Sequence, residues 1–313
     1  MVVIITGPTA SGKTALSEQL VPPLQGAIIN ADMGQFYTAL TVGTAKPPWQ
    51  TLPFDSYLFD WIDTPRDCSV VAFKEAVDQC VASVEACHAT PIIVGGSSFY
   101  IKSLFYPPHD IGCAQSIDTT PLEALSAVEL WEQLNIIDPV RARDINKTDH
   151  YRLVRALALW HGTGKKPSTL KPQFVMPYKK ILLVIVLPER SVVRERIAHR
   201  TGQMINNDGW VDEVRGLIGT EWQSFVKTKK LVGYTELIDW LAAGADSTTL
   251  ADVITTISIK TRQYAKRQEN FLKKLAQDLV SDASDMFAEL EVLIVPNNSL
   301  QVVNQIIDIV KKS

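Results

Sequence analysis

The stretch GPTASGKT occupies residues 7–14, between an apolar run at 2–6 and a helical pattern of apolar residues at 15–20. It fits the pattern GxxxxGK[ST], in which backbone N–H groups and the start of a helix surround phosphate oxygens. In this pattern Lys13 reaches the terminal phosphates and the hydroxyl of Thr14 ligates Mg²⁺. We therefore predict a site for a diphosphate, or for a nucleotide such as ATP, formed by Gly7, Pro8, Thr9, Ala10, Ser11, Gly12, Lys13 and Thr14.

Apolar runs and helical patterns alternate along the rest of the chain. Short apolar runs at 27–30, 91–94 and 181–187 predict strands, and residues 73–87 have the spacing of an amphipathic helix. Strands that alternate with helices indicate a parallel α/β sheet, here of the P-loop NTPase-like type. The long segment between the third and fourth strands has helical spacing. We therefore predict a P-loop core at 1–114, an all-helical insertion at 115–177, and the remainder of the core with a C-terminal tail at 178–313.

Composition narrows the class of protein. The chain has 313 residues, of which 46% are hydrophobic, and its formal net charge is −3. Its apolar runs are too short to span a membrane, and its cysteines and histidines lack the spacing of metal ligands. These features predict a cytoplasmic protein without a membrane segment. The basic residues gather in 141–155, 179–200 and 227–274. A basic surface for a polyanion is therefore compatible with the negative net charge of the whole chain.

The acid expected nearest to the phosphates is Asp32, which follows the second predicted strand. Ligands of parallel α/β sheets bind at the carboxyl ends of the strands. The strand at 91–94 leads into Gly95, Gly96 and Ser97 and provides no Walker-B acid. An isolated aspartate suits a general base that acts on a nucleophile other than water, so the residues favour group transfer over nucleotide hydrolysis. Asp32 as a plain turn or capping residue is the alternative.

Several further motifs, taken in order, carry a resemblance to a known family. They are Gly7–Thr14, Asn30-Ala-Asp32 with Gln35 and Tyr37, Gly43–Pro47, Pro91–Gly96 with Tyr100, Asp138-Pro139, Asp149 with Arg152 and Arg155, Gly162–Lys165, Val232–Tyr234 and Thr261–Gln268. Together they resemble the tRNA dimethylallyltransferase (isopentenyl-diphosphate:tRNA transferase) family over about residues 1–275. The last cysteine is Cys113, so the C-terminal zinc finger of the eukaryotic members is missing and the bacterial type is expected.

The resemblance implies a specific reaction. A dimethylallyl group would move from dimethylallyl diphosphate to N6 of adenosine 37, beside the tRNA anticodon, after the base has been flipped out of its stack. Asp32 would accept the proton, with Ser97 and Lys230 as further catalytic residues and Mg²⁺ on Thr14. The anticodon stem-loop would contact Asp32, Met33, Gly34, Gln35, Lys46, Tyr151, Arg152, Arg155, Arg262, Lys266, Arg267 and Gln268.

This chain departs from the family pattern at several positions. Met33-Gly34 replaces the usual Ser-Met after the aspartate, and Ser97 replaces a threonine. Lys230 stands where the family has an arginine, which would have offered a bidentate fork to the diphosphate. Glu269-Asn270 replaces Thr-Trp, and Ala158 replaces a glutamate. These exchanges predict slower turnover or altered RNA contacts.

Three other functions compete with tRNA prenylation. An adenylate-type isopentenyltransferase would use the same donor with a free nucleotide as the acceptor. A P-loop small-molecule kinase would use Asp32 to activate a hydroxyl, and a non-catalytic RNA-binding paralogue would keep only the scaffold. The basic residues Arg152 and Arg155 and the block Thr261–Gln268 favour tRNA, because a free nucleotide requires no extended basic surface. The resemblance also implies a monomer.

Overall fold

The computed structural model describes residues 1–107, 118–170, 172–246, 249–286 and 289–312. The chain divides into two compact units, of which the first comprises Met1–Lys102 with Met176–Ser313 and the second comprises Ser103–Val175. The second unit starts earlier than the insertion expected at 115–177, and the boundary expected at residue 114 lies outside the described residues.

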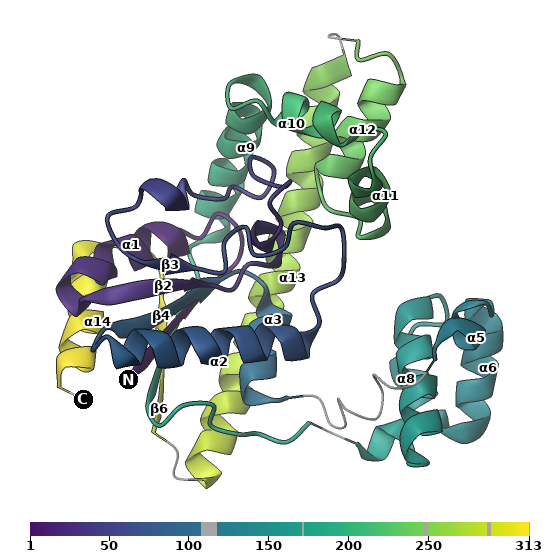
Figure 1. The fold of residues 1–313 in the computed structure, drawn as a ribbon, viewed down its shortest axis with the longest axis horizontal. Coiled ribbons are helices and arrows are strands. Elements are labelled where there is room, and N and C mark those ends of the chain that lie inside the picture. The colour runs from purple at the N-terminus through teal and green to yellow at the C-terminus, as the bar shows by residue number, and fades with distance from the viewer. Residues whose placement is uncertain (108–117, 171, 247–248, 287–288, 313) are drawn as a thin grey trace. The chain divides into compact units, whose positions relative to one another are not determined.

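The first unit is built on a parallel sheet of six strands in the order β3-β2-β4-β1-β5-β6 (Figure 1). Its strands are β1 (Val2–Thr6), β2 (Gly26–Asn30), β3 (Ser56–Tyr57), β4 (Thr90–Gly95), β5 (Ile181–Val186) and β6 (Leu290–Val295). This confirms the predicted α/β fold. The carboxyl ends of β1, β2 and β4 lie at one edge of the sheet, which brings the loops that follow these strands together.

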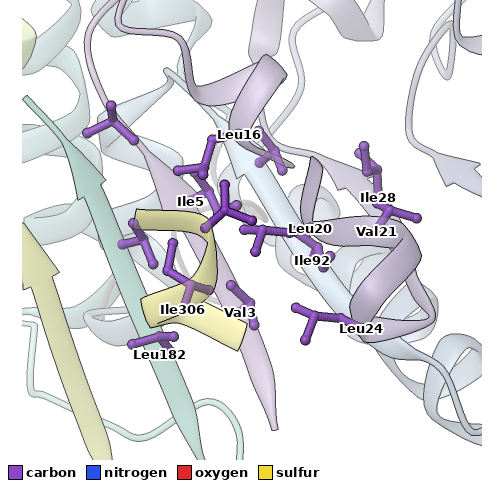
Figure 2. Close-up of a cluster of buried hydrophobic side chains, with 14 of the residues drawn as sticks. Val3, Ile5, Leu16, Leu20, Val21, Leu24, Ile28, Ile92, Leu182 and Ile306 are labelled. Carbon is purple, nitrogen blue, oxygen red and sulfur yellow. The ribbon is translucent and has the colours of Figure 1, made fainter. Parts of the chain in front are cut away.

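Helices cover both faces of this sheet, which is why its central strands are apolar throughout. They include α1 (Lys13–Leu24), α2 (Val70–Ala86), α3 (Ser98–Phe105) and α14 (Leu300–Lys311). On one face Leu16 and Leu20 of α1 and Ile306 of α14 pack against Val3 and Leu182 of the strands (Figure 2). Each such side chain is fully buried and contributes roughly 1.5–3 kcal/mol. This core fixes the start of α1 above the end of β1.

A group of helices follows β5 in the first unit. They are α9 (Arg190–Asn206), α10 (Trp210–Leu217), α11 (Glu221–Thr228), α12 (Tyr234–Ala242) and α13 (Leu250–Asp285). The last of these has 36 residues and a length of about 54 Å at ~1.5 Å per residue. It packs along α9 and also touches β6 (Figure 1). One continuous helix therefore runs from the α10–α12 region to the edge of the sheet.

The second unit is helical in its described residues. It contains α5 (Thr120–Glu123), α6 (Ala127–Ile137), α7 (Pro139–Asp144), α8 (His150–Thr163) and the short 3₁₀ helix η3 (Pro167–Thr169). Leu130 and Leu134 of α6 pack against Leu153 and Leu157 of α8 in a separate apolar core. Side-chain caps start three of these helices: Ser126, Asp138 and Asp149 accept backbone N–H groups at the starts of α6, α7 and α8. Within the described residues, no helix is long and apolar enough to cross a membrane.

Candidate functional site

The loop at residues 7–14 has the backbone shape of a phosphate cradle. Gly12 directly precedes α1 and has a φ of 94°, a left-handed conformation that glycine adopts without steric cost. Ala10 also has a positive φ, of 61°. The turn leaves the first N–H groups of α1 without partners inside the helix, directed toward the space above the sheet edge. The loop therefore has the backbone shape that the prediction of a diphosphate site requires, with Lys13 as the first residue of α1.

Lys13 and Asp32 converge on Gly96, at the end of β4. A Cβ atom added to Gly96 would lie 3.2 Å from Lys13 Nζ, from Asp32 Oδ2 and from Gln268 Nε2. Burial lowers the pKa of Lys13; the charge of Asp32 opposes this shift, whereas that of Arg200 adds to it. A side chain at position 96 would have to displace these side-chain atoms by a few tenths of an ångström, so glycine leaves room for the ammonium and carboxylate groups beside it.

Hydrogen bonds on both sides of Asp32 hold the backbone that carries its side chain. The side-chain oxygen of Asn30 accepts the N–H of Asp32 at 3.0 Å, and the Asn30 amide group donates to Leu58 O at 3.0 Å. On the other side, Ser97 Oγ accepts the N–H of Met33 at 2.8 Å, where the short helix η1 (Met33–Phe36) begins. Ser97 therefore acts in this structure through its hydroxyl, which it shares with the threonine of the family pattern.

Arg200 is a second cation at the phosphate loop, which the sequence motifs do not identify. Its Nη2 donates to Thr9 Oγ1 at 2.6 Å, and burial lowers its pKa while Asp32 acts in the opposite direction. One turn earlier on α9, Arg196 Nη1 donates to the carbonyl oxygens of Ala10 at 3.4 Å and Ser11 at 3.3 Å. Helical spacing places both arginines on one face of α9, but only the packing of α9 shows which site that face meets.

Two of the predicted RNA contacts have side chains enclosed by the protein. Gln268 is 6% exposed; its amide oxygen accepts the N–H of Thr9 at 2.9 Å and its amide nitrogen donates to Gly96 O at 2.7 Å. The side chain of Lys46 is 2% exposed, forms an ion pair with Asp60, and donates to Tyr37 O at 2.7 Å. Both side chains hold loops in place, so we do not retain them as RNA contacts.

A pocket opens beside Lys13 and Asp32. Gln35 lies in its wall, with its amide nitrogen donating to Thr44 O at 3.2 Å and to Ala45 O at 3.3 Å. Apolar side chains form another part of the wall. The full lining is Lys13, Thr14, Ser17, Glu18, Ile28, Asn30, Asp32, Gln35, Pro47, Leu52, Phe59, Val94 and Gly95. Cationic, acidic and apolar groups are thus available together to a ligand with a diphosphate head and a short hydrocarbon chain.

The donor set of this pocket suits Mg²⁺ held jointly with phosphate oxygens. Thr14, Asp32 and Asn30 present oxygen atoms, the ligands that this cation prefers. Among the described residues, no group of three or more His, Cys, Asp or Glu side chains forms a cage for a metal ion. The residues present therefore fit a cation that arrives with its diphosphate, with Thr14 as the predicted protein ligand.

Helix α13 carries the predicted cationic residues of the first unit. Lys266 and Arg267 are exposed and Arg262 is half-buried. They lie on the same helix as Gln268, so the helix that touches the phosphate loop also presents positive charge outward. The exchange at Glu269 adds little free negative charge, because Arg190 and Lys273 pair with this carboxylate at 2.9 and 2.7 Å and its side chain is 14% exposed.

The second unit presents the other predicted RNA contacts from the start of α8. The side chain of Tyr151 is 70% exposed, that of Arg152 is 67% exposed, and Arg155 is exposed one turn later. Ala158 is fully buried in the core of this unit. The alanine thus places no charge in that core, where a buried carboxylate would need a partner.

Lys230 lies between α11 and α12, is exposed, and has a φ of 50°. In the described part of the chain, no hydrogen bond or ion pair joins it to Lys13, to Asp32 or to the phosphate loop. The structure therefore brings Lys13, Asp32 and Ser97 together, and the catalytic role of Lys230 stays a prediction.

Comparisons with known proteins agree on one family. Residues 35–275 match the IPP transferase family. The protein named tRNA dimethylallyltransferase 1 of Citrifermentans bemidjiense is 32% identical over 281 residues, which are 87% of this chain and 89% of that protein. The tRNA dimethylallyltransferase of Anoxybacillus flavithermus is 35% identical over 271 residues, 85% of each chain. A solved structure, the tRNA delta(2)-isopentenylpyrophosphate transferase of Staphylococcus epidermidis, is 25% identical with a TM-score of 0.61, over 100% of this chain and 99% of that one.

Proposed function

The chain belongs to the IPP transferase family, and on that premise we propose that it transfers a dimethylallyl group to tRNA. The donor is dimethylallyl diphosphate, and the acceptor atom is N6 of adenosine 37, beside the anticodon. One observation carries the proposal. Lys13 Nζ and Asp32 Oδ2 each lie 3.2 Å from the same point above Gly96, so a group that binds diphosphate and a group that binds protons meet in one place.

The reaction exchanges one bond for another. The N6 nitrogen attacks the first carbon of the dimethylallyl group, and the bond from that carbon to the diphosphate oxygen breaks with its electron pair. The exocyclic amine is a poor nucleophile, because its lone pair is delocalised into the ring. Asp32 accepts the N6 proton as the C–N bond forms. The N–H groups of Asp32 and Met33 donate to the side chains of Asn30 and Ser97, which holds the backbone that carries the carboxylate.

The departing diphosphate requires positive charge that is already in position. Lys13, Arg200 and the N–H groups at the start of α1 provide it without rearrangement, which is the condition for strong electrostatic stabilisation. Thr14 would hold Mg²⁺, which when bound neutralises charge on the diphosphate. Burial of Lys13 and Arg200 strengthens their attraction for the diphosphate anion, because less water screens the charges.

The RNA backbone is contacted by cationic side chains on two helices. Lys266 and Arg267 extend outward from α13, and Arg152 and Arg155 from α8 of the second unit. Contacts of this kind neutralise phosphates and make binding sensitive to salt. These cations, on each unit taken by itself, favour an RNA acceptor over the free nucleotide of an adenylate-type isopentenyltransferase and over the small molecule of a P-loop kinase.

The test uses purified protein, dimethylallyl diphosphate, Mg²⁺ and an anticodon stem-loop with adenosine at position 37, read by mass spectrometry. We expect a five-carbon addition on that adenosine and none on free AMP. Addition on AMP alone would assign the chain to the adenylate-type enzymes. Phosphate transfer from ATP would indicate a kinase, and RNA binding without addition would indicate a non-catalytic paralogue.

A further inference from the structure

Two sequence motifs to which the reaction gives no role meet on helix α10. Gly43 and Gly233 both pack directly against the indole ring of Trp210. A Cβ atom on Gly43 would lie 2.2 Å from Trp210 Nε1, and one on Gly233 would lie 2.0 Å from Trp210 Cη2. No side chain fits at either position, because the ring already fills the space. The turn at residues 41–46 and the start of α12 are therefore held together by the first residue of α10.

One turn along α10, Glu213 binds the same two segments through its carboxylate. Its Oε2 accepts the N–H groups of Thr41 at 2.9 Å and Val42 at 2.6 Å. Its Oε1 accepts the N–H of Gly43 at 3.1 Å and the hydroxyl of Tyr234 at 2.7 Å. A carboxylate has about four lone-pair sites, so these four donors occupy the group completely. Burial, with a smaller contribution from Glu213, raises the pKa of Tyr234 well above its ordinary value, so its hydroxyl stays a donor.

The opposite side of this turn holds Gln35. The turn is closed by its own hydrogen bonds, from Lys46 N to Thr41 O at 3.1 Å and from Ala45 N to Val42 O at 2.9 Å. The carbonyl oxygens of Thr44 and Ala45 then accept the amide nitrogen of Gln35 at 3.2 and 3.3 Å. An amide nitrogen has two hydrogens, and these two acceptors use both of them. Gln35 consequently has only its side-chain oxygen to offer a ligand.

We propose that Glu213 is a positioning residue for acceptor recognition. It holds the turn at residues 41–46 so that Gln35, in the wall of the same pocket as Asp32, offers a hydrogen-bond acceptor to the incoming base. An acceptor at this place selects a base with an exocyclic amine over one with a keto oxygen, because the keto oxygen would be left unpaired. This inference rests on the proposed function for the identity of the acceptor.

The first measurement compares the affinity of two stem-loops, with adenosine or inosine at the acceptor position. The wild-type protein should bind the adenosine form about tenfold more tightly, as the loss of one buried hydrogen bond implies. Glu213→Gln places an amide N–H against the backbone donors, so the turn shifts and this ratio should fall to about twofold. The control is Asp212→Asn, because Asp212 is the adjacent carboxylate on α10, is 76% exposed, and pairs only with the neighbouring Arg215 in the described structure.

A double-mutant cycle with Gln35→Ala separates positioning from general stability. If Glu213 acts through Gln35, Glu213→Gln should weaken adenosine stem-loop binding about tenfold in the wild-type background and less than twofold in the Gln35→Ala background. The KM for dimethylallyl diphosphate should change less than about twofold. Tyr234→Phe, which removes a single donor, should show the same pattern with a loss of about threefold.

Additive losses, or an adenosine preference that survives Glu213→Gln, would overturn the inference and leave Glu213 with a purely structural role. The binding ratio does not depend on turnover. If the wild type bound the adenosine form selectively, lost this preference in Glu213→Gln and yet transferred nothing, the result would contradict the proposed function while supporting the role of Glu213.

Discussion

The side-chain oxygen of Gln268 accepts the backbone N–H of Thr9 at 2.9 Å, which ties α13 to the phosphate loop across 259 positions of sequence. The same amide donates to Gly96 O at 2.7 Å, so one side chain joins the loops after β1 and β4. Its neighbours Lys266 and Arg267 extend outward from the same helix. The part of the proposed RNA surface that lies on α13 and the proposed donor site therefore share one continuous helix.

Asp32→Asn should reduce transfer by about 10²–10⁴-fold, the contribution of a general base, because asparagine cannot accept the N6 proton. Affinity for the stem-loop should change less than about twofold, since the amide keeps the size of the carboxylate. Single-turnover transfer and equilibrium binding measure the two effects separately. A variant with near-normal turnover would exclude Asp32 as the base.

Arg200→Gln should weaken binding of inorganic pyrophosphate and of dimethylallyl diphosphate by about tenfold or more, because a hydrogen bond to a charged group contributes roughly 1.5–3 kcal/mol. Arg200→Lys keeps the charge but loses the planar fork, so its affinity for both ligands should lie between those of Arg200→Gln and the wild type. Arg194→Gln, on an exposed part of the same helix, is the control. Calorimetric titration with pyrophosphate checks the expectation. Equal affinities for Arg200→Gln and Arg194→Gln would place Arg200 outside the donor site.

Replacing both Lys266 and Arg267 by alanine should weaken stem-loop binding. The slope of log affinity against log salt should fall by about one for each RNA phosphate that the protein no longer neutralises. Lys311→Ala changes an exposed cation on α14 and should leave the slope unchanged. Binding isotherms at several salt concentrations give the slope. If the double variant kept the slope of the wild type, Lys266 and Arg267 would not belong to the RNA interface.

Asp138→Ala should destabilise the second unit by about 1–3 kcal/mol, because it leaves two backbone N–H groups without their acceptor. These are the N–H groups of Ser168 at 2.7 Å and Arg141 at 3.1 Å. Hydrogen–deuterium exchange of peptides from α6 to α8 measures the loss, with Asp144→Ala at the exposed end of α7 as the control. Similar exchange in Asp138→Ala and Asp144→Ala would contradict the stabilising role given to the Asp138 carboxylate.

The stability given by Asp138 should also depend on pH. Burial alone would raise its pKa, but the hydrogen bonds from Ser168 and Arg141 outweigh this and hold the pKa below the ordinary value. A lowered pKa stabilises the fold above the ordinary aspartate pKa of about 3.9 and loses this effect as the pH falls toward the folded-state pKa. The free energies of unfolding of the wild type and Asp138→Ala should thus differ by a constant amount between about pH 5 and 8, and this difference should shrink as the pH falls further.

Local sequence was enough to predict the phosphate loop and Asp32. The pattern GPTASGKT depends on glycine conformations and on the helix that follows, and both are properties of neighbouring residues. Asp32 could be placed because parallel strands end at a common edge. Arg200, Glu213 and Trp210 could not be found in this way, because each belongs to a helix that reaches the site from more than a hundred residues away.

The exchanges from the family pattern also required the structure for their interpretation. From the sequence we expected Glu269 to add a free negative charge, whereas in the structure Arg190 and Lys273 pair with it. We also predicted Gln268 and Lys46 as RNA contacts, whereas in the structure both are enclosed by hydrogen-bond partners. The sequence shows the type and charge of each residue. The burial of a side chain and its interaction partners depend on which helices pack together.

The sequence by itself determined the α/β class, the phosphate-binding turn and the family, because these follow from short-range patterns of glycine, apolar residues and motif spacing. The tertiary structure decided which cations lie at the loop of residues 7–14, which amides hold the loops, and that Gln35 offers only its oxygen. The physical reason is that hydrogen bonds and desolvation act over a few ångströms in space, and packing brings together residues that the chain keeps far apart.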